Sequence, residues 1–249
     1  MKRARPASSG LGESDLLAPL EPASPTATAG TDGHRARLRA RLLNAGPDSL
    51  ADYEMLEIVL FALPRRDTKP LARALLDRFG SFAAAIAAPL PDLLAVDGLG
   101  ETGAAALKAV QAAALRLERA GLADRPVLAS WDRLIGYLTA SLALEKVEQV
   151  RVLFLDTRNR LIADEVQGRG TVNHTPVYPR EVVRRALELH ASALILAHNH
   201  PSGDPTPSRE DISMTREIQA ATALMRITLH DHIIISAGRW VSFRQEGLL

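Results

Sequence analysis

An apolar run that ends in two histidines sets the tightest limit on how this chain folds. Residues 193–197 read Ala-Leu-Ile-Leu-Ala, which is typical of a buried strand, and His198 and His200 follow directly. Alternate residues of a strand point to the same face, so both imidazoles should lie on one side of a sheet. A Pro/Gly/Asp-rich loop then leads to a helix predicted from Ser208 to Leu224. The segment therefore predicts a helix that starts beside the end of a histidine-bearing strand.

Asp211 lies on the first turn of that helix, where the loop can fold it back toward the histidines. Two histidines, one carboxylate and a fourth position left for water are typical of a catalytic Zn²⁺ site. The chain has no cysteine, so a metal site must use His, Asp, Glu or water. A zinc ion lowers the pKa of its bound water to about 7, which yields a nucleophile at neutral pH. Two local explanations compete: a His-x-His pair arises by chance, and Ser208 with Asp211 matches a helix capping box.

The composition is that of an ordinary globular protein. Of 249 residues, 47% are hydrophobic and 24% are charged, and the formal net charge of +1 gives no overall case for nucleic-acid binding. The apolar runs are too short to span a bilayer, so no membrane partner is expected. The basic start is followed by a Ser/Pro/Glu-rich stretch instead of an apolar signal segment. We therefore expect a cytoplasmic protein.

Composition and hydrophobic pattern divide the chain into three parts. Residues 1–33 are rich in Ser, Pro, Ala, Thr and Gly and are predicted to be a disordered tail. Residues 34–123 have a helical pattern, and 127–249 mix strands with helices after a linker near 121–126. The expected fold class is α/β, with a helical domain followed by a mixed β-sheet sandwiched by helices. Helices are predicted at 53–61, 71–79, 180–189 and 208–224, and strands at 150–155, 161–163, 193–197, 233–235 and 240–243.

A glycine hairpin in the helical part resembles the helix-hairpin-helix motif. Gly98, Leu99 and Gly100 separate two short helices, and Ala104 and Leu107 occupy the packing positions of the second one. In that family the hairpin amides bind phosphate, which implies weak, non-specific DNA binding here. The alternative is a plain tight turn, because this copy has acidic Glu101 where a basic residue is often found.

A run of four arginines between residues 35 and 41 precedes the hairpin. Such a run is either a phosphate-binding surface or a solvated helix face. The sequence leaves both interpretations open.

The histidine segment resembles the JAMM motif of the JAB/MPN metalloprotease family. It has His-x-His-Pro, then seven residues between His200 and Ser208, then two more before Asp211. The string HNHPSGDPTPS is similar to the RadC branch of that family. Three further strings resemble the same branch: VLFLDTRNRLI at 152–162, VYPREVV at 177–183 and DHIII at 231–235. The resemblance covers about residues 34–249, and it implies a Zn²⁺-dependent peptidase or isopeptidase whose substrate the sequence does not identify.

The resemblance also assigns roles to residues. It implies that the zinc ligands are His198, His200 and Asp211. Glu148, at the start of the first predicted strand, matches the general base that passes a proton from water to the leaving group, with Glu165 as the alternative. Ser208 matches the hydroxyl that stabilises the developing oxyanion.

The second His-x-His unit, at residues 230–232, has no third ligand at a suitable spacing. We expect it to be structural, or to orient a metal-ligating imidazole through a hydrogen bond from Asp231 or His232. The other polar candidates are expected to be ordinary surface or partly buried side chains: His174, His190 and Arg180, of which Arg180 has the alternative of binding a substrate carboxylate or phosphate.

Three functions remain open at this point. The first is zinc-dependent peptide or isopeptide hydrolysis, and the second is a DNA-associated accessory role in repair or recombination. The third is a binding module that keeps the fold without catalysis. The complete set of matched ligands favours the first.

Overall fold

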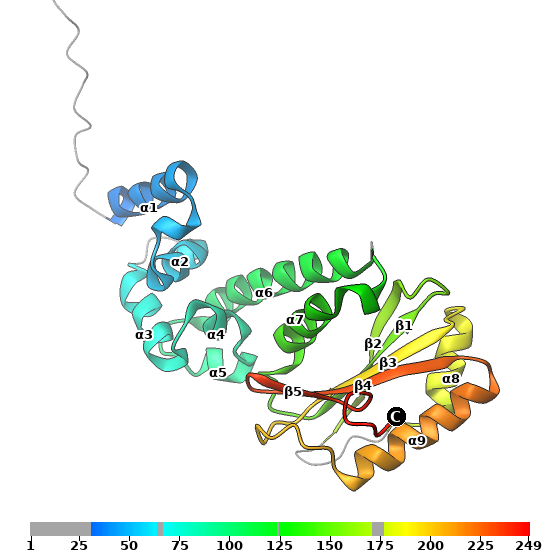
Figure 1. The fold of residues 1–249 in the computed structure, drawn as a ribbon. Coiled ribbons are helices and arrows are strands. Elements are labelled where there is room, and N and C mark those ends of the chain that lie inside the picture. The colour runs from blue at the N-terminus through cyan, green and yellow to red at the C-terminus, as the bar shows by residue number, and fades with distance from the viewer. Residues whose placement is uncertain (1–30, 64–66, 124, 171–176) are drawn as a thin grey trace, which may run out of the picture.

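The computed structural model describes residues 31–63, 67–123, 125–170 and 177–249. Within these ranges the chain forms an N-terminal helical region and a C-terminal sheet region, joined by one long helix (Figure 1). The helices of the first region are α1 (Thr31–Ala45), α2 (Asp52–Val59), α3 (Lys69–Phe79), α4 (Phe82–Ala87), α5 (Leu90–Leu94) and α6 (Gly100–Ala123), with short 3₁₀ turns at Pro47–Ser49 and Leu60–Ala62.

Helix boundaries in this region follow local sequence signals. Pro70 occupies the first turn of α3, and Gly80 ends that helix with a left-handed φ of 85°. The hairpin between α5 and α6 is built as the glycine pattern predicts, with φ of 82° at Gly98 and 60° at Gly100. Leu99 lies between them and is 1% exposed. Apolar side chains from α2 to α6 form one core around it.

The arginine run on α1 makes contacts within the protein. Arg41 forms an ion pair with Glu54 at 2.8 Å, and Arg35 donates to the carbonyl of Leu63 at 2.9 Å. The guanidinium groups of Arg35 and Arg39 lie over the ring of Phe61. These contacts fix α1 against α2 and the turn that follows it, and phosphate binding by the run stays a prediction.

The described part of the sheet region contains five strands, three α-helices and a 3₁₀ turn at Val127–Ser130. In chain order, the helices and strands are α7 (Trp131–Leu142), β1 (Gln149–Leu155), β2 (Leu161–Arg169), α8 (Pro179–Glu188), β3 (Ala193–Asn199), α9 (Arg209–Leu224), β4 (Thr228–Ser236) and β5 (Arg239–Ser242). The strand order is β2-β1-β3-β4-β5. β3 and β4 are parallel, and the other neighbours are antiparallel.

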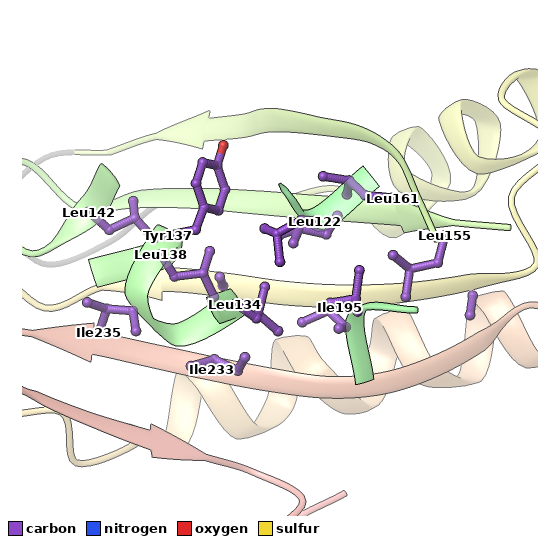
Figure 2. Close-up of a cluster of buried hydrophobic side chains, with 14 residues drawn as sticks. Leu122, Leu134, Tyr137, Leu138, Leu142, Leu155, Leu161, Ile195, Ile233 and Ile235 are labelled. Carbon is purple, nitrogen blue, oxygen red and sulfur yellow. The ribbon is translucent and has the colours of Figure 1, made fainter. Parts of the chain in front are cut away.

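Helices cover both faces of this mixed sheet. α6 and α7 lie on one face, where Leu134 and Leu138 of α7 pack with Ile195 and Ile233 of the sheet (Figure 2). α8 and α9 cover the other face, where Ile218 of α9 belongs to a second buried cluster. The expected α/β class, with a mixed sheet sandwiched by helices, is therefore confirmed.

Some boundaries differ from the sequence-based expectations. α1 begins at Thr31, so residues 31–33 are helical, while the rest of the expected tail lies outside the described residues. α6 runs to Ala123, through the start of the expected linker, and its Leu122 packs into the core of the sheet region. The domain limits at 34–123 and 127–249 stay a prediction. α7 was not expected, although Leu134, Leu138 and Leu142 repeat every four residues.

The described helices include none with the length and apolar character needed to cross a membrane.

Candidate metal centre

The candidate site lies where the carboxyl end of β3 meets the amino end of α9. α9 connects two parallel strands, β3 and β4, and must begin near the end where β3 finishes. His198 continues the side of β3 that carries Leu194 and Leu196, which face α8 and α9. The Nε2 atoms of His198 and His200 are 2.9 Å apart. Strand and helix thereby bring the two histidines to Asp211.

Asp211 completes a group of three possible metal ligands. Its Oδ1 lies 3.2 Å from Nε2 of His198, and its Oδ2 lies 3.5 Å from Nε2 of His200. One ligand atom from each of the three residues lies within 4.8 Å of the others, and His198 and Asp211 are buried. Two imidazole nitrogens and one carboxylate oxygen form the donor set of a catalytic zinc site. The residues present therefore fit a zinc ion.

The start of α9 holds the Asp211 carboxylate in place. Ser208 is the N-cap residue, and its hydroxyl oxygen accepts from the backbone N–H of Asp211 at 3.0 Å. In return, Oδ2 of Asp211 accepts from the backbone N–H of Ser208 at 2.8 Å and from its hydroxyl at 2.6 Å. The capping box expected from the sequence is present, and it saturates Oδ2. Oδ1 therefore remains directed at Nε2 of His198.

A chain of hydrogen bonds sets the tautomer of His198. The hydroxyl of Thr215 donates to the Asp211 carbonyl at 2.6 Å, so its oxygen accepts from Nδ1 of His232 at 2.6 Å. His232 then presents a bare Nε2, which accepts from Nδ1–H of His198 at 2.7 Å. With its proton on Nδ1, neutral His198 has its lone pair on Nε2, the atom that faces Asp211.

His200 is oriented from the loop that follows it. Its Nδ1 donates to the carbonyl of Asp204 at 2.7 Å, which again leaves the lone pair on Nε2. The loop is held by the carbonyl of Gly203, which accepts from Ser236 at 2.9 Å and from Arg239 at 2.7 Å. Both histidines therefore present the same kind of atom to the same point.

The electrostatics of the group follow from these contacts. Burial acts to raise the pKa of Asp211, but in the metal-free site the hydrogen bonds that His198 and His200 donate when their Nε2 atoms carry a proton outweigh burial and lower that pKa. Protonated His200 can donate from Nε2 to Asp211, which raises the pKa of His200, and the charge of Glu148 adds to this effect. Burial lowers the pKa of His232 well below its ordinary value. His232 is therefore neutral at pH 7, as the hydrogen-bond chain requires.

Glu148 lies one strand away from the ligands. Val150 of β1 pairs with His198 of β3 in antiparallel register, so Glu148 falls opposite His200 when that register is continued by two residues. Glu148 shares the face of His198, because it lies two residues before Val150. It is partly buried.

Glu165, the alternative base, is tied to a cation. It is bound by the guanidinium of Arg185, with contacts of 2.8 Å from Nε and 2.6 Å from Nη2. This hydrogen bonding lowers the pKa of Glu165.

The remaining candidates lie away from the three ligands. The carboxylate of Asp231 accepts from Ser242 and from backbone N–H groups of His232 and Arg244, so His232 and not Asp231 contacts a ligand imidazole. Nε2 of His230 contacts Asn159 at 2.7 Å, at the far end of β1. Two further side chains, His190 and Arg180, are exposed, and His174 lies outside the described residues.

Sequence reasoning missed Thr215, which completes the chain behind His198. A signal was present, since Thr215 is four residues after Asp211 and so lies on the same face of α9.

Fold and site together define a JAB domain protein: a helix-covered mixed sheet with two histidines at one strand end and an aspartate on the next helix. In agreement, the family model for the RadC-like JAB domain matches residues 128–248. A UPF0758 protein of Rhodobacter capsulatus is 59% identical over 213 residues, which cover 85% of this chain and 100% of the relative. A UPF0758 protein of Ruegeria pomeroyi is 54% identical over 217 residues, covering 87% of this chain and 97% of the relative. The chain belongs to the RadC family.

Proposed function

We propose that this protein is a zinc-dependent hydrolase of the JAMM type that cleaves an amide bond in a peptide or isopeptide substrate. The observation that carries the proposal is the convergence of three ligand atoms, Nε2 of His198, Nε2 of His200 and Oδ1 of Asp211. Both imidazoles are hydrogen-bonded through Nδ1, which leaves the coordinating nitrogen unprotonated. A histidine pair kept only for packing would not need this arrangement.

His198, His200 and Asp211 would hold the ion, and a fourth position would be left for water. The zinc ion, when bound, supplies a Lewis acid that polarises the substrate carbonyl and activates water at neutral pH. The buried walls of the site raise the strength of every electrostatic interaction inside it.

Glu148 would serve as the general base and then as the general acid. Its register opposite His200, and its effect on the pKa of that residue, support a carboxylate close to the ligands. It would take a proton from the attacking water and deliver it to the leaving amine nitrogen. Glu165 is less suited, because Arg185 holds its carboxylate in the ionised form.

Ser208 would have two roles at different moments. In the resting arrangement its hydroxyl donates to Oδ2 of Asp211 and so fixes the ligand. To stabilise an oxyanion, the same O–H must rotate away from Oδ2 of Asp211. Oδ2 then still accepts a hydrogen bond from the backbone N–H of Ser208. Asp211 therefore stays anchored while the hydroxyl is used for the substrate.

Zinc content of the purified protein tests the metal assignment. We expect about one zinc ion per chain by elemental analysis, and almost none in the double variant His198→Ala/His200→Ala. His230→Ala, a histidine of the other His-x-His unit, is the matched control and should keep its zinc. Stoichiometric zinc in the double variant would show that the ion binds elsewhere.

The hydrolytic part is tested with the same preparations. The zinc-loaded protein is incubated with a peptide library and with lysine-linked isopeptides, and new amino termini or free lysine side chains are quantified by mass spectrometry. Cleavage by the wild type that is lost in the double variant is the expected result. A zinc-loaded protein that cleaves none of these would support the binding-module function instead.

DNA binding through residues 98–100 is a second candidate function. One observation favours it, namely the positive φ of Gly98 and Gly100, which gives the hairpin the backbone shape that the motif requires. The arginine run adds little, because Arg35 and Arg41 contact α2 and the following turn.

A further inference from the structure

Asn199, between the two histidines, uses its whole amide group on one segment. Its Oδ1 accepts from the backbone N–H of Gln149 at 2.9 Å. Its Nδ2 donates to the carbonyls of Glu145 and Val147, both at 3.1 Å. Asn199 is 1% exposed, and its bond with Gln149 is buried, while the other two bonds are partly buried. The side chain of one residue thus holds the segment 145–149 at three points.

That segment carries Glu148. The bonds from Asn199 fall on both sides of it, on Val147 and on Gln149. The carbonyl of Glu148 itself accepts from the backbone N–H of Gly170 at 3.0 Å. The flanking residues Leu144 and Val147 are more than 40% exposed, so the segment has few apolar contacts there to hold it. The position of Glu148 relative to the histidines therefore depends strongly on these hydrogen bonds.

We infer that Asn199 is a positioning residue, which fixes the Glu148 carboxylate relative to the metal ligands. The inference rests on the proposed function, because Glu148 matters only if it exchanges protons at the site. Alternate side chains of β3 point to opposite faces of the sheet, so His198 and His200 face one side and Asn199 faces the other. One His-Asn-His tripeptide thereby holds both the ligands and the segment that carries the base.

A role limited to stability would have a different signature. Loss of the three hydrogen bonds of Asn199 lowers stability whatever the segment does, so unfolding measurements alone do not discriminate. A positioning role predicts a specific coupling to Glu148: once Glu148 is neutralised, loss of Asn199 should have no further effect at the site.

Acetohydroxamate binding to the Co²⁺-loaded full-length protein, followed by visible absorption, measures that coupling. A hydroxamic acid gives up a proton when it chelates a metal ion, and a nearby carboxylate that takes this proton strengthens binding. We expect Glu148→Gln to weaken binding at least about tenfold. Asn199→Ser should weaken it about tenfold with unchanged Co²⁺ content, since a hydrogen-bond partner behind a site residue is typically worth 10–100-fold. The double variant should bind no more weakly than Glu148→Gln alone.

Asn159→Ser is the matched control, because it removes a half-buried amide that contacts His230 at the opposite end of β1. It should bind acetohydroxamate as the wild type does. If Asn199→Ser does not fold, Asn199→Asp replaces it; this variant keeps an oxygen for Gln149 but has no donors for Glu145 and Val147.

The outcomes separate the inference from the proposed function. A wild type that binds no Co²⁺ overturns both. Binding that depends on Glu148 but not on Asn199 overturns the inference and leaves the proposed function standing. Loss of Co²⁺ from Asn199→Ser, or additive losses in the double variant, would mean that Asn199 acts on the ligands directly, and would also overturn the inference.

Discussion

The helical region and the sheet region both contain histidine–carboxylate contacts, yet the contacts differ in whether a ligand nitrogen is left available to a metal ion. In the helical region, Nε2 of His34 lies 2.8 Å from Oε2 of Glu57, a fully buried carboxylate, and the contact ties α1 to α2. In the sheet region, the Nε2 atoms of His198 and His200 face Asp211, and their Nδ1 atoms are hydrogen-bonded to His232 and to the carbonyl of Asp204.

The difference lies in the second nitrogen of each imidazole. A histidine that meets one carboxylate forms a pair, which contributes to packing and to the register of two helices. Histidines held through Nδ1, with Nε2 atoms converging on one carboxylate, form a site that a cation can enter. The kind of residue is the same in both regions, and the surrounding donors and acceptors decide the outcome.

The largest expected effect concerns Glu148. Glu148→Gln should lower turnover of any peptide substrate found by library screening by about a hundredfold to ten-thousandfold, because general acid–base catalysis is lost. Zinc content should not change, since a general base is not a ligand. Turnover and zinc are measured on the same preparations, with Glu165→Gln as the matched control. Loss of turnover in Glu165→Gln, with turnover retained in Glu148→Gln, would place the general base on β2.

The next effect concerns the hydrogen bond behind His198. His232→Phe removes the acceptor for Nδ1–H of His198 and should weaken zinc binding about 10- to 100-fold, as measured by competition with a chelator. His34→Phe makes the same change in the helical region and should leave zinc affinity unaltered. Equal losses in the two variants would mean that general destabilisation, and not the tautomer of His198, controls affinity.

A smaller effect concerns the alkaline stability of the sheet region. Burial and the nearby Asp164 raise the pKa of Tyr137 to about 12. The folded state therefore keeps the phenol proton after the unfolded state begins to lose it near pH 10, so this stabilisation is complete below pH 10 and is lost as the pH rises toward 12. At pH 11 the loss should reach about 1 kcal/mol.

Tyr137→Phe should remove this part of the pH dependence, although it also costs the hydrogen bond to Asp164 at every pH. Both tryptophans of the chain, Trp131 and Trp240, lie in the sheet region, so denaturant unfolding followed by their fluorescence reports on that region. Parallel stability curves for wild type and variant between pH 9 and 11 would contradict the assignment.

The smallest effect concerns DNA. If the hairpin amides at Gly98 and Gly100 hold phosphate, the full-length protein should bind labelled duplex weakly, without sequence preference, and less tightly as salt rises. Gly100→Val should remove this binding, because φ of 60° is strained for a β-branched residue. Zinc content should stay unchanged in that variant. Binding that survives in Gly100→Val would assign the contact to another surface.

Much of the fold was predictable because its signals are local. Gly80 and Pro70 mark the ends of α3, Ser208 caps α9, and the apolar run at 193–197 forms β3. Strand β4 was harder to bound, because only 233–235 carries a continuous apolar signal while the strand spans Thr228–Ser236. Its first residues, 228–232, are polar except for Leu229, and pairing with β3 makes them a strand.

The sequence by itself determined the three candidate ligands, since spacing and side-chain type are sufficient to propose His198, His200 and Asp211. Only the tertiary structure decided which atoms face one another. Thr215 and His232 lie on different elements, and their contact exists because α9 packs across β4. The same holds for Asn199 and the segment around Glu148, which are about 50 residues apart in the chain. Hydrogen-bond direction depends on distances of a few tenths of an ångström between such elements, and no local pattern in the sequence encodes those distances.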